Sequence, residues 1–202
     1  MYIFAYYLHI MKKETLIQKF NENNGWLCSK DFGYQPFVYA TLNEMIENNE
    51  VEKVKKGLFH FIEISTYNEQ ENIAKYYPNA VLCLFSAWHH YELSTTVPYQ
   101  YYLAVPHKAN PAKIEHPPIK FFYWSEAQLQ LGICQEKNIR IYDIEKSVCD
   151  AVKFRNKVGE EITIEVLKNY MKLKDRNIEK LMKYAKQMKI EKTISPMLKP
   201  LL

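Results

Sequence analysis

The sequence predicts an α+β chain of two domains: a small helical module closed by a β-hairpin over residues 12–66, and a larger mixed α/β domain over residues 67–202 that ends in helices. Three observations support this. Apolar residues recur at helical spacing before residue 50, a short β-rich segment then surrounds a Lys-Gly turn, and strand-like apolar runs begin at residue 80 and precede periodic helical patterns. A chain of 202 residues with 48% hydrophobic content can bury a core in each domain.

The first part of the small module alternates short periodic stretches with turn residues. Residues 12–23 are predicted to be helical, and residues 26–27 are predicted to form a strand that pairs with the later hairpin. Ser29 is expected to cap a short helix over residues 30–32, and Gly33 to end that helix in the left-handed conformation.

The second part of the module predicts a longer helix and a hairpin. Pro36 suits the first turn of a helix over residues 36–48, and a turn at Lys56-Gly57 joins two strands within residues 51–62. The predicted buried stripe of this helix consists of Val38, Leu42, Met45 and Ile46. Helix, turn, helix and hairpin in this order are typical of a winged helix-turn-helix, a module that usually binds DNA, although such modules also dock proteins.

If the module binds DNA, particular side chains are candidates for the contact. Tyr39, Ala40 and Asn43 are expected to point outward, with Gln35 just ahead of the helix. The amides of Gln35 and Asn43 are suited to reading adenine edges, and the Tyr39 hydroxyl to reaching a phosphate. The predicted phosphate contacts of the hairpin are Lys53, Lys55 and Lys56.

The larger domain is predicted to contain a mixed or antiparallel sheet followed by helices. Predicted strands cover residues 80–85, 99–106, 119–124, 129–133 and 138–142. Predicted helices cover residues 69–76, 86–93, 144–157, 164–173 and 177–188. Ser86 and Asp143 are the expected N-caps of two of these helices, and Pro196 and Pro200 are expected to mark a tail.

Positive charge is concentrated at the end of the chain. The net charge is +4, which divides into −1 for residues 12–66, −2 for residues 67–150 and +7 for residues 151–202. The lysines expected on exposed faces of the last two helices are Lys168, Lys172, Lys180, Lys183 and Lys186. They are candidates for additional contacts with DNA or a partner, and a solvated lysine surface is the alternative.

The residue types that carry catalysis or bind metals form no recognisable constellation. His89 and His90 are neighbours and cannot face one ligand from a single helix side. Asp143, Glu145 and Asp150 suggest a helix cap and a buried polar network rather than a catalytic site. Since nucleotide-binding and hydrolase motifs are also missing, we expect no enzyme activity, no metal and no cofactor.

The cellular location is predicted from cysteine spacing and hydropathy. The four cysteines are widely separated, which favours free thiols in a reducing cytoplasm, and no apolar run is long enough to span a membrane. Residues 1–11 lack a basic leader and a cleavage site, so no signal peptide is expected. We predict a flexible extension there, or a start assigned too early, since Met11 precedes two lysines.

Three segments together resemble the AbiEi family of antitoxins from abortive-infection, type IV toxin-antitoxin systems. The segments are Leu42-x-x-Met45-Ile46 with residues 50–59, residues 80–93 with 97–98 and 103–106, and residues 139–150. The resemblance implies a cytoplasmic transcriptional regulator that represses its own operon by binding inverted repeats in promoter DNA, and that counteracts a nucleotidyltransferase-type toxin encoded beside it. Whether the two proteins bind directly stays open.

One departure from the family concerns the recognition helix. Winged domains of the family commonly carry Arg on this helix, whereas this chain has Glu44 and Glu47 there and no Arg. The alternative function is therefore a protein-binding adaptor in which the winged module docks a partner and has no affinity for DNA.

Overall fold

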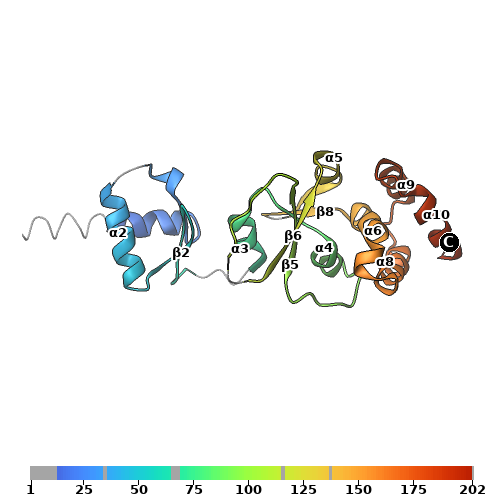
Figure 1. The fold of residues 1–202 in the computed structure, drawn as a ribbon. Coiled ribbons are helices and arrows are strands. Elements are labelled where there is room, and N and C mark those ends of the chain that lie inside the picture. The colour runs from blue at the N-terminus through green and yellow to red at the C-terminus, as the bar shows by residue number, and fades with distance from the viewer. Residues whose placement is uncertain (1–12, 34–35, 65–68, 115–116, 137, 202) are drawn as a thin grey trace, which may run out of the picture. The chain divides into compact units, whose positions relative to one another are not determined.

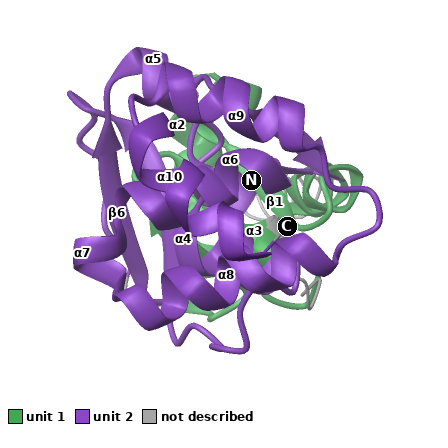
Figure 2. Cartoon of the chain, turned by 90° about the vertical axis from the view of Figure 1, so that its right-hand side faces the viewer, with its two compact units in different colours: residues 1–72 green, residues 73–202 purple. Residues whose placement is uncertain are grey.

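A computed structural model of the chain describes residues 13–33, 36–64, 69–114, 117–136 and 138–201. The chain divides into two compact units, residues 1–72 and 73–202 (Figure 2). The domain boundary predicted between residues 66 and 67 falls within residues outside the described ranges. No described helix combines the length and the apolar composition that crossing a membrane requires.

Unit 1 consists of helices packed on a three-stranded antiparallel sheet. Residues 13–22 are helical. The elements that follow are β1 (Trp26–Cys28), the 3-10 helix η1 (Ser29–Asp31), α2 (Pro36–Glu47), β2 (Val51–Lys55) and β3 (Leu58–Phe61). The strand order is β1-β3-β2, with Trp26 opposite His60. The predicted pairing of the first strand with the hairpin is therefore confirmed.

Both longer helices of unit 1 end in the same way. Asn24 and Asn49 adopt the left-handed conformation, with φ of 54° and 56°. After α2, the Glu50 N–H donates to the Met45 carbonyl at 2.9 Å and the Asn49 N–H to the Ile46 carbonyl at 3.0 Å. These are the two bonds of a Schellman motif, so Asn49 supplies the αL residue that ends α2.

The prediction that Ser29 caps the short helix is wrong. The residue before η1 is Cys28, whose N–H donates to the Asp31 carboxylate at 2.8 Å. The Ser29 hydroxyl instead donates to the Gly57 carbonyl at 3.1 Å. A serine uses the same hydroxyl to cap a helix and to bond to a distant turn. Here the Ser29 hydroxyl bonds to the turn of the hairpin. Gly33 does adopt the predicted left-handed conformation, with φ of 65°.

The core of unit 1 confirms most of the predicted stripe of α2. Val38, Leu42 and Met45 are buried, whereas Ile46 is only partly buried at the edge of the core. Thr41 is also buried, because its hydroxyl donates to the Phe37 carbonyl one turn earlier at 3.1 Å and needs no solvent.

Unit 2 is built on a five-stranded mixed sheet. Its strands are β4 (Val81–Leu82), β5 (Tyr101–Pro106), β6 (Ile119–Trp124), β7 (Ile133–Glu136) and β8 (Ile139–Tyr142), in the order β6-β5-β4-β8-β7. The pairs β5–β6 and β4–β8 are parallel, and the pairs β4–β5 and β7–β8 are antiparallel. The prediction of a mixed α/β domain is thus confirmed.

Two strands differ from their predicted bounds. The run over residues 80–85 gives only the two-residue β4, because Leu84 takes a positive φ of 47° and α4 (Leu84–His90) begins there. The residue before α4 is Cys83 and not the predicted cap Ser86, whose hydroxyl accepts the Tyr102 N–H at 2.8 Å. The strand predicted over residues 129–133 is also wrong, since Leu129 ends the short helix α5 (Glu126–Leu129) and β7 follows.

The remaining helices cover the sheet and close the chain. They are α3 (Glu69–Tyr76), α6 (Ile144–Lys153), α7 (Arg155–Val158), α8 (Glu160–Lys172), α9 (Ile178–Gln187), α10 (Glu191–Leu198) and the 3-10 turn η2 (Lys199–Leu201). Helices α4, α6 and α8 lie on one side of the sheet (Figure 1). The predicted helix over residues 144–157 is broken at Phe154, and the predicted tail is helical, with Pro196 inside α10.

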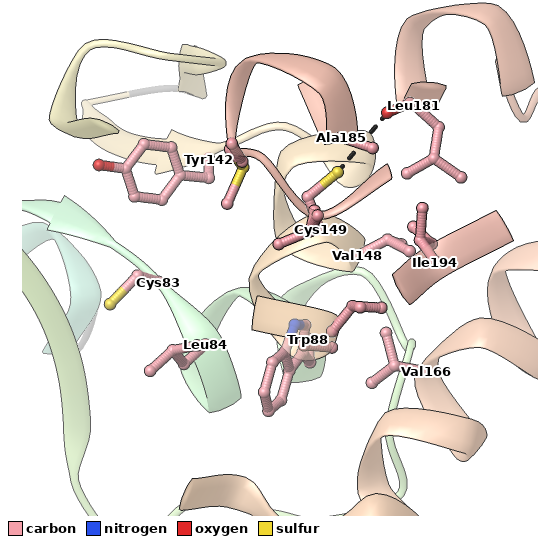
Figure 3. Close-up of a cluster of buried hydrophobic side chains, with 14 of the residues drawn as sticks. Cys83, Leu84, Trp88, Tyr142, Val148, Cys149, Val166, Leu181, Ala185 and Ile194 are labelled. Carbon is pink, nitrogen blue, oxygen red and sulfur yellow. Dashed lines mark hydrogen bonds between the residues drawn. The ribbon is translucent and has the colours of Figure 1, made fainter. Parts of the chain in front are cut away.

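The core of unit 2 surrounds α6, as Figure 3 shows. The indole N–H of Trp88 on α4 donates to the Ser147 carbonyl on α6 at 2.9 Å. The thiol of Cys149 lies 3.6 Å from the Leu181 carbonyl on α9. All four cysteines are free, as predicted; Cys83 and Cys149 are buried, whereas the other two are partly accessible.

Candidate nucleic-acid interface

The outward face of α2 is the first candidate surface. Asn43 and Ala40 are exposed, as predicted, on the face opposite the buried Leu42. Tyr39, also predicted to point outward, is half-buried and packs edge-on against Phe32, with ring centroids 5.4 Å apart. Gln35, the other predicted base-reading residue, lies outside the described residues.

The β2–β3 hairpin is the second candidate surface, and its turn is held firmly. Gly57 has a φ of 76°, and a Cβ placed on it would lie 2.2 Å from the Ser29 hydroxyl, so the turn fits only a glycine. Lys53 and Lys56 are exposed, whereas Lys55 is half-buried, and this burial lowers its pKa. Of the three predicted phosphate contacts, Lys53 and Lys56 therefore extend into solvent.

The acidic residues near these surfaces differ in how strongly they would repel an anion. Glu50 accepts a bond from Lys13 at 2.7 Å, and this ion pair offsets its charge. Glu44 and Glu47 are exposed on α2 and Glu52 on β2. A phosphate backbone near α2 would meet these three carboxylates, and the exposed hairpin lysines Lys53 and Lys56 would oppose their repulsion.

The predicted lysine surface of unit 2 is divided by the structure. Lys168 and Lys172 on α8, and Lys183 and Lys186 on α9, are exposed. Lys180 is not free for a partner, because its ammonium lies 3.1 Å from Asp143 and 2.9 Å from Glu145. Burial acts to lower the pKa of Lys180, but the hydrogen bonds to these two carboxylates outweigh it and raise the pKa.

Asp143 and Glu145 form a polar network that joins the start of α6 to α9. Asp143 caps α6 as predicted, accepting the Lys146 N–H at 2.8 Å, and also accepts the Tyr184 hydroxyl at 3.0 Å. Glu145 accepts the Asn177 N–H at 3.2 Å. Both carboxylates are thus occupied by structural hydrogen bonds.

Asp150 belongs to a separate buried ion pair, which matches its predicted place in a buried polar network. The Lys146 ammonium lies 2.7 and 2.8 Å from its two oxygens, and both side chains are fully buried. Burial raises the pKa of Asp150, and Lys146 acts in the opposite direction. The ammonium also lies 4.3 and 4.1 Å from the ring centroids of Trp124 and Tyr142, so aromatic faces complete its surroundings.

The adjacent histidines do not share a ligand. The His90 ring nitrogen lies 2.6 Å from the Glu136 carboxylate, which also accepts the Tyr91 hydroxyl at 2.9 Å, whereas His89 is exposed. Within the described ranges, no three His, Cys, Asp or Glu side chains are grouped as metal ligands. Sequence patterns do not reveal this His-Glu-Tyr cluster, because Glu136 is distant in sequence and comes close only through β7.

No model of a known protein family and no curated protein matches the chain.

Proposed function

We propose that unit 1 is a winged helix-turn-helix that binds DNA, with α2 as the recognition helix and the β2–β3 hairpin as the wing. The observation that carries this proposal is the order of the elements together with the pairing of β1 on β3. The exposed amide of Asn43 on α2 and the exposed ammonium groups of Lys53 and Lys56 on the hairpin support it.

We further propose that the protein is a cytoplasmic antitoxin that represses its own operon and counteracts a nucleotidyltransferase-type toxin. The resemblance to AbiEi antitoxins supports this role, and two of its segments lie side by side in unit 2. Leu82 pairs with Ile141 between β4 and β8, and the Trp88 indole bonds to Ser147. The segments over residues 80–93 and 139–150 therefore act as one structural unit.

The direct test is binding of the full chain to DNA from upstream of its own reading frame, measured by fluorescence anisotropy. If Asn43 reads a base edge, Asn43→Ala should weaken operator binding by about 1–3 kcal/mol and relax specificity at one position. Asn21→Ala, an exposed amide on the preceding helix, is the matched control and should leave affinity unchanged. Equal affinity of wild-type protein for operator and scrambled DNA would refute specific recognition.

The exposed lysines of unit 2 are proposed to bind the phosphates of flanking DNA. Changing Lys183 and Lys186 to Gln should lower the salt dependence of operator affinity by about one unit for each phosphate that is no longer neutralised. The double variant Lys75→Gln/Lys108→Gln, at two exposed lysines outside α8 and α9, controls for the change in net charge. An unchanged slope in the Lys183→Gln/Lys186→Gln variant would leave a solvated surface as the explanation for these lysines.

Neutralisation of the toxin needs a separate measurement. Co-expression with the product of an adjacent nucleotidyltransferase gene should restore growth that the toxin alone arrests. Pull-down of the toxin by the tagged full chain then distinguishes direct binding from an indirect mechanism. If no such gene lies beside this one, or if growth is not restored, the antitoxin proposal fails while DNA binding can still hold.

One observation favours the rival function, a protein-binding adaptor without DNA affinity. Unit 1 has a hollow of about 300 Å³ lined by Leu16, Phe32, Phe37 and Val38 together with polar residues that include Lys19 and Asp31, and Phe37 is 46% exposed. The exposed aromatic ring beside this hollow is the feature that a protein partner would contact. Two results together would establish this alternative. The wild-type chain would not bind DNA, and Phe37→Ser would abolish its binding to a protein partner.

A further inference from the structure

Unit 2 contains a cleft that neither the DNA-binding surface nor the antitoxin proposal uses. It has a volume of about 400 Å³ and lies between α5, the last residue of α6 and the turn that follows α9. Figure 2 shows α5 and α9 at the same edge of unit 2. The volume is within the range of sites for small molecules, about 300–1,000 Å³.

The polar side chains of the cleft are suited to an anion. Lys153 and Lys189 line it, no Asp or Glu is among the described lining residues, and Gln128 adds an amide. The Gln128 side-chain nitrogen is buried and has no hydrogen-bond partner among the described residues. A buried donor without an acceptor is costly, so this amide would gain a hydrogen bond by turning toward an anion bound in the cleft.

Lys189 occupies a backbone position that is unfavourable for lysine. Its φ is 58°, at the residue that closes α9, where the Ile190 N–H donates to the Ala185 carbonyl at 2.9 Å and the Lys189 N–H to the Lys186 carbonyl at 3.1 Å. Glycine or asparagine is usual at this position of a Schellman motif. The side chain makes no ion pair within the described residues, so no intramolecular charge contact offsets the strain.

Lys153 faces the same cleft from α6 and retains capacity for a ligand. Its ammonium donates to the Met188 carbonyl at 3.4 Å, a long bond that leaves further donors unused. The carbonyl groups at the end of α9 carry partial negative charge, and this contact offsets it next to the cleft.

We propose that this cleft binds a small phosphate ester, with the phosphate between Lys153 and Lys189 and the organic part against Ala127, Leu131 and Met188. Two lysines supply charge-assisted hydrogen bonds to phosphate oxygens, and the three apolar side chains suit a flat or aliphatic body. The site would respond to a free metabolite and is independent of DNA binding by unit 1.

The test uses the full chain with adenosine monophosphate as the probe, measured by calorimetry and by amide chemical shifts. Lys153→Gln should weaken binding about tenfold, as expected when one charge-assisted hydrogen bond to a phosphate is removed. Lys189→Gly should weaken binding similarly while raising Tm, because glycine tolerates the positive φ. Lys192→Gln, an exposed lysine of α10 outside the cleft, is the matched control and should bind normally.

Inorganic phosphate and a short DNA duplex of unrelated sequence separate the sources of the phosphate. Binding of the nucleotide, weakened by both cleft variants, supports the proposal. If Lys153→Gln and Lys189→Gly change only the binding of the duplex, the proposed small-molecule site is wrong and these two lysines belong to the DNA-binding surface. Absence of nucleotide binding at millimolar concentration, or equal binding by Lys189→Gly and wild type, would also overturn it.

Discussion

The buried pair of Lys146 and Asp150 predicts a large and pH-dependent effect of one substitution. Lys146→Met keeps an unbranched side chain one atom shorter and removes the ammonium that contacts both oxygens of Asp150 at 2.7 and 2.8 Å. Neither side chain is accessible to solvent, so the carboxylate cannot replace this partner with water.

The expected magnitude follows from leaving a buried charge without its partner. Breaking a buried ion pair in this way costs about 3–5 kcal/mol of unfolding free energy. The double variant Lys146→Met/Asp150→Asn should recover most of this loss, because no charge remains buried. The comparison separates loss of the charge pair from loss of packing against Trp124 and Tyr142.

The effect should also depend on pH. Burial already raises the pKa of Asp150 above its ordinary value, and removing Lys146 raises it further because Lys146 opposes that shift. A carboxyl with a raised pKa in the folded state contributes most stability below its unfolded pKa of about 4, and the contribution is lost as pH rises through the folded pKa. Lys146→Met should therefore be less destabilising at pH 5 than at pH 7.5.

Urea unfolding at the two pH values provides the measurement. All variants would carry Trp26→Phe, so that fluorescence from Trp88 and Trp124 reports unit 2 alone. A loss below about 1 kcal/mol at pH 7.5 would refute the claim that the pair is buried, given the cost expected for an unpaired internal charge. An equal loss at both pH values would refute the proposed ionisation of Asp150.

Further substitutions test the packing of each unit. Leu42→Ala should destabilise unit 1 by roughly 2–5 kcal/mol in denaturant unfolding, since Leu42 is fully buried. Gly57→Ala should cost about 2–3 kcal/mol, from the positive φ and the displaced Ser29 hydroxyl, whereas Gly33→Ala, with no atom within 4 Å of the added carbon, should cost about 1–2 kcal/mol. Lys180→Met should lower the Tm of unit 2 by an amount equivalent to roughly 1–2 kcal/mol, and the same change at an exposed lysine of α9 should have little effect.

Periodicity and turn residues are sufficient to predict the elements of unit 1. The stripe that includes Leu42 and Met45 is buried, and the strand at Trp26 pairs with the hairpin as expected. The role of Ser29 could not be predicted, because a serine before a short helix has the same local pattern whether its hydroxyl caps that helix or bonds to a turn 28 residues away.

Unit 2 shows where local patterns fail to give element boundaries. The apolar run over residues 80–85 looks like one strand, but it contains the strand β4 and the start of α4, and Val81, Leu82 and Leu84 are buried in both elements alike. The change occurs at Leu84, a non-glycine residue with positive φ, and no local signal marks it. Proline usually breaks a helix, yet α10 contains Pro196.

The charge pattern of the last helices shows why sequence spacing cannot identify a binding surface. Lys180, Lys183 and Lys186 repeat at an interval of three residues, which places them along one side of α9 and suggests one basic face. The structure separates them, because Asp143 and Glu145 at the start of α6 form ion pairs with Lys180 and with no other described lysine. Of the lysines predicted to form this surface, those exposed to a partner are therefore Lys183 and Lys186 together with Lys168 and Lys172 of α8. A net charge of +7 over residues 151–202 overstates the positive charge that this region presents, since two carboxylates that offset part of it lie in the preceding segment of the sequence.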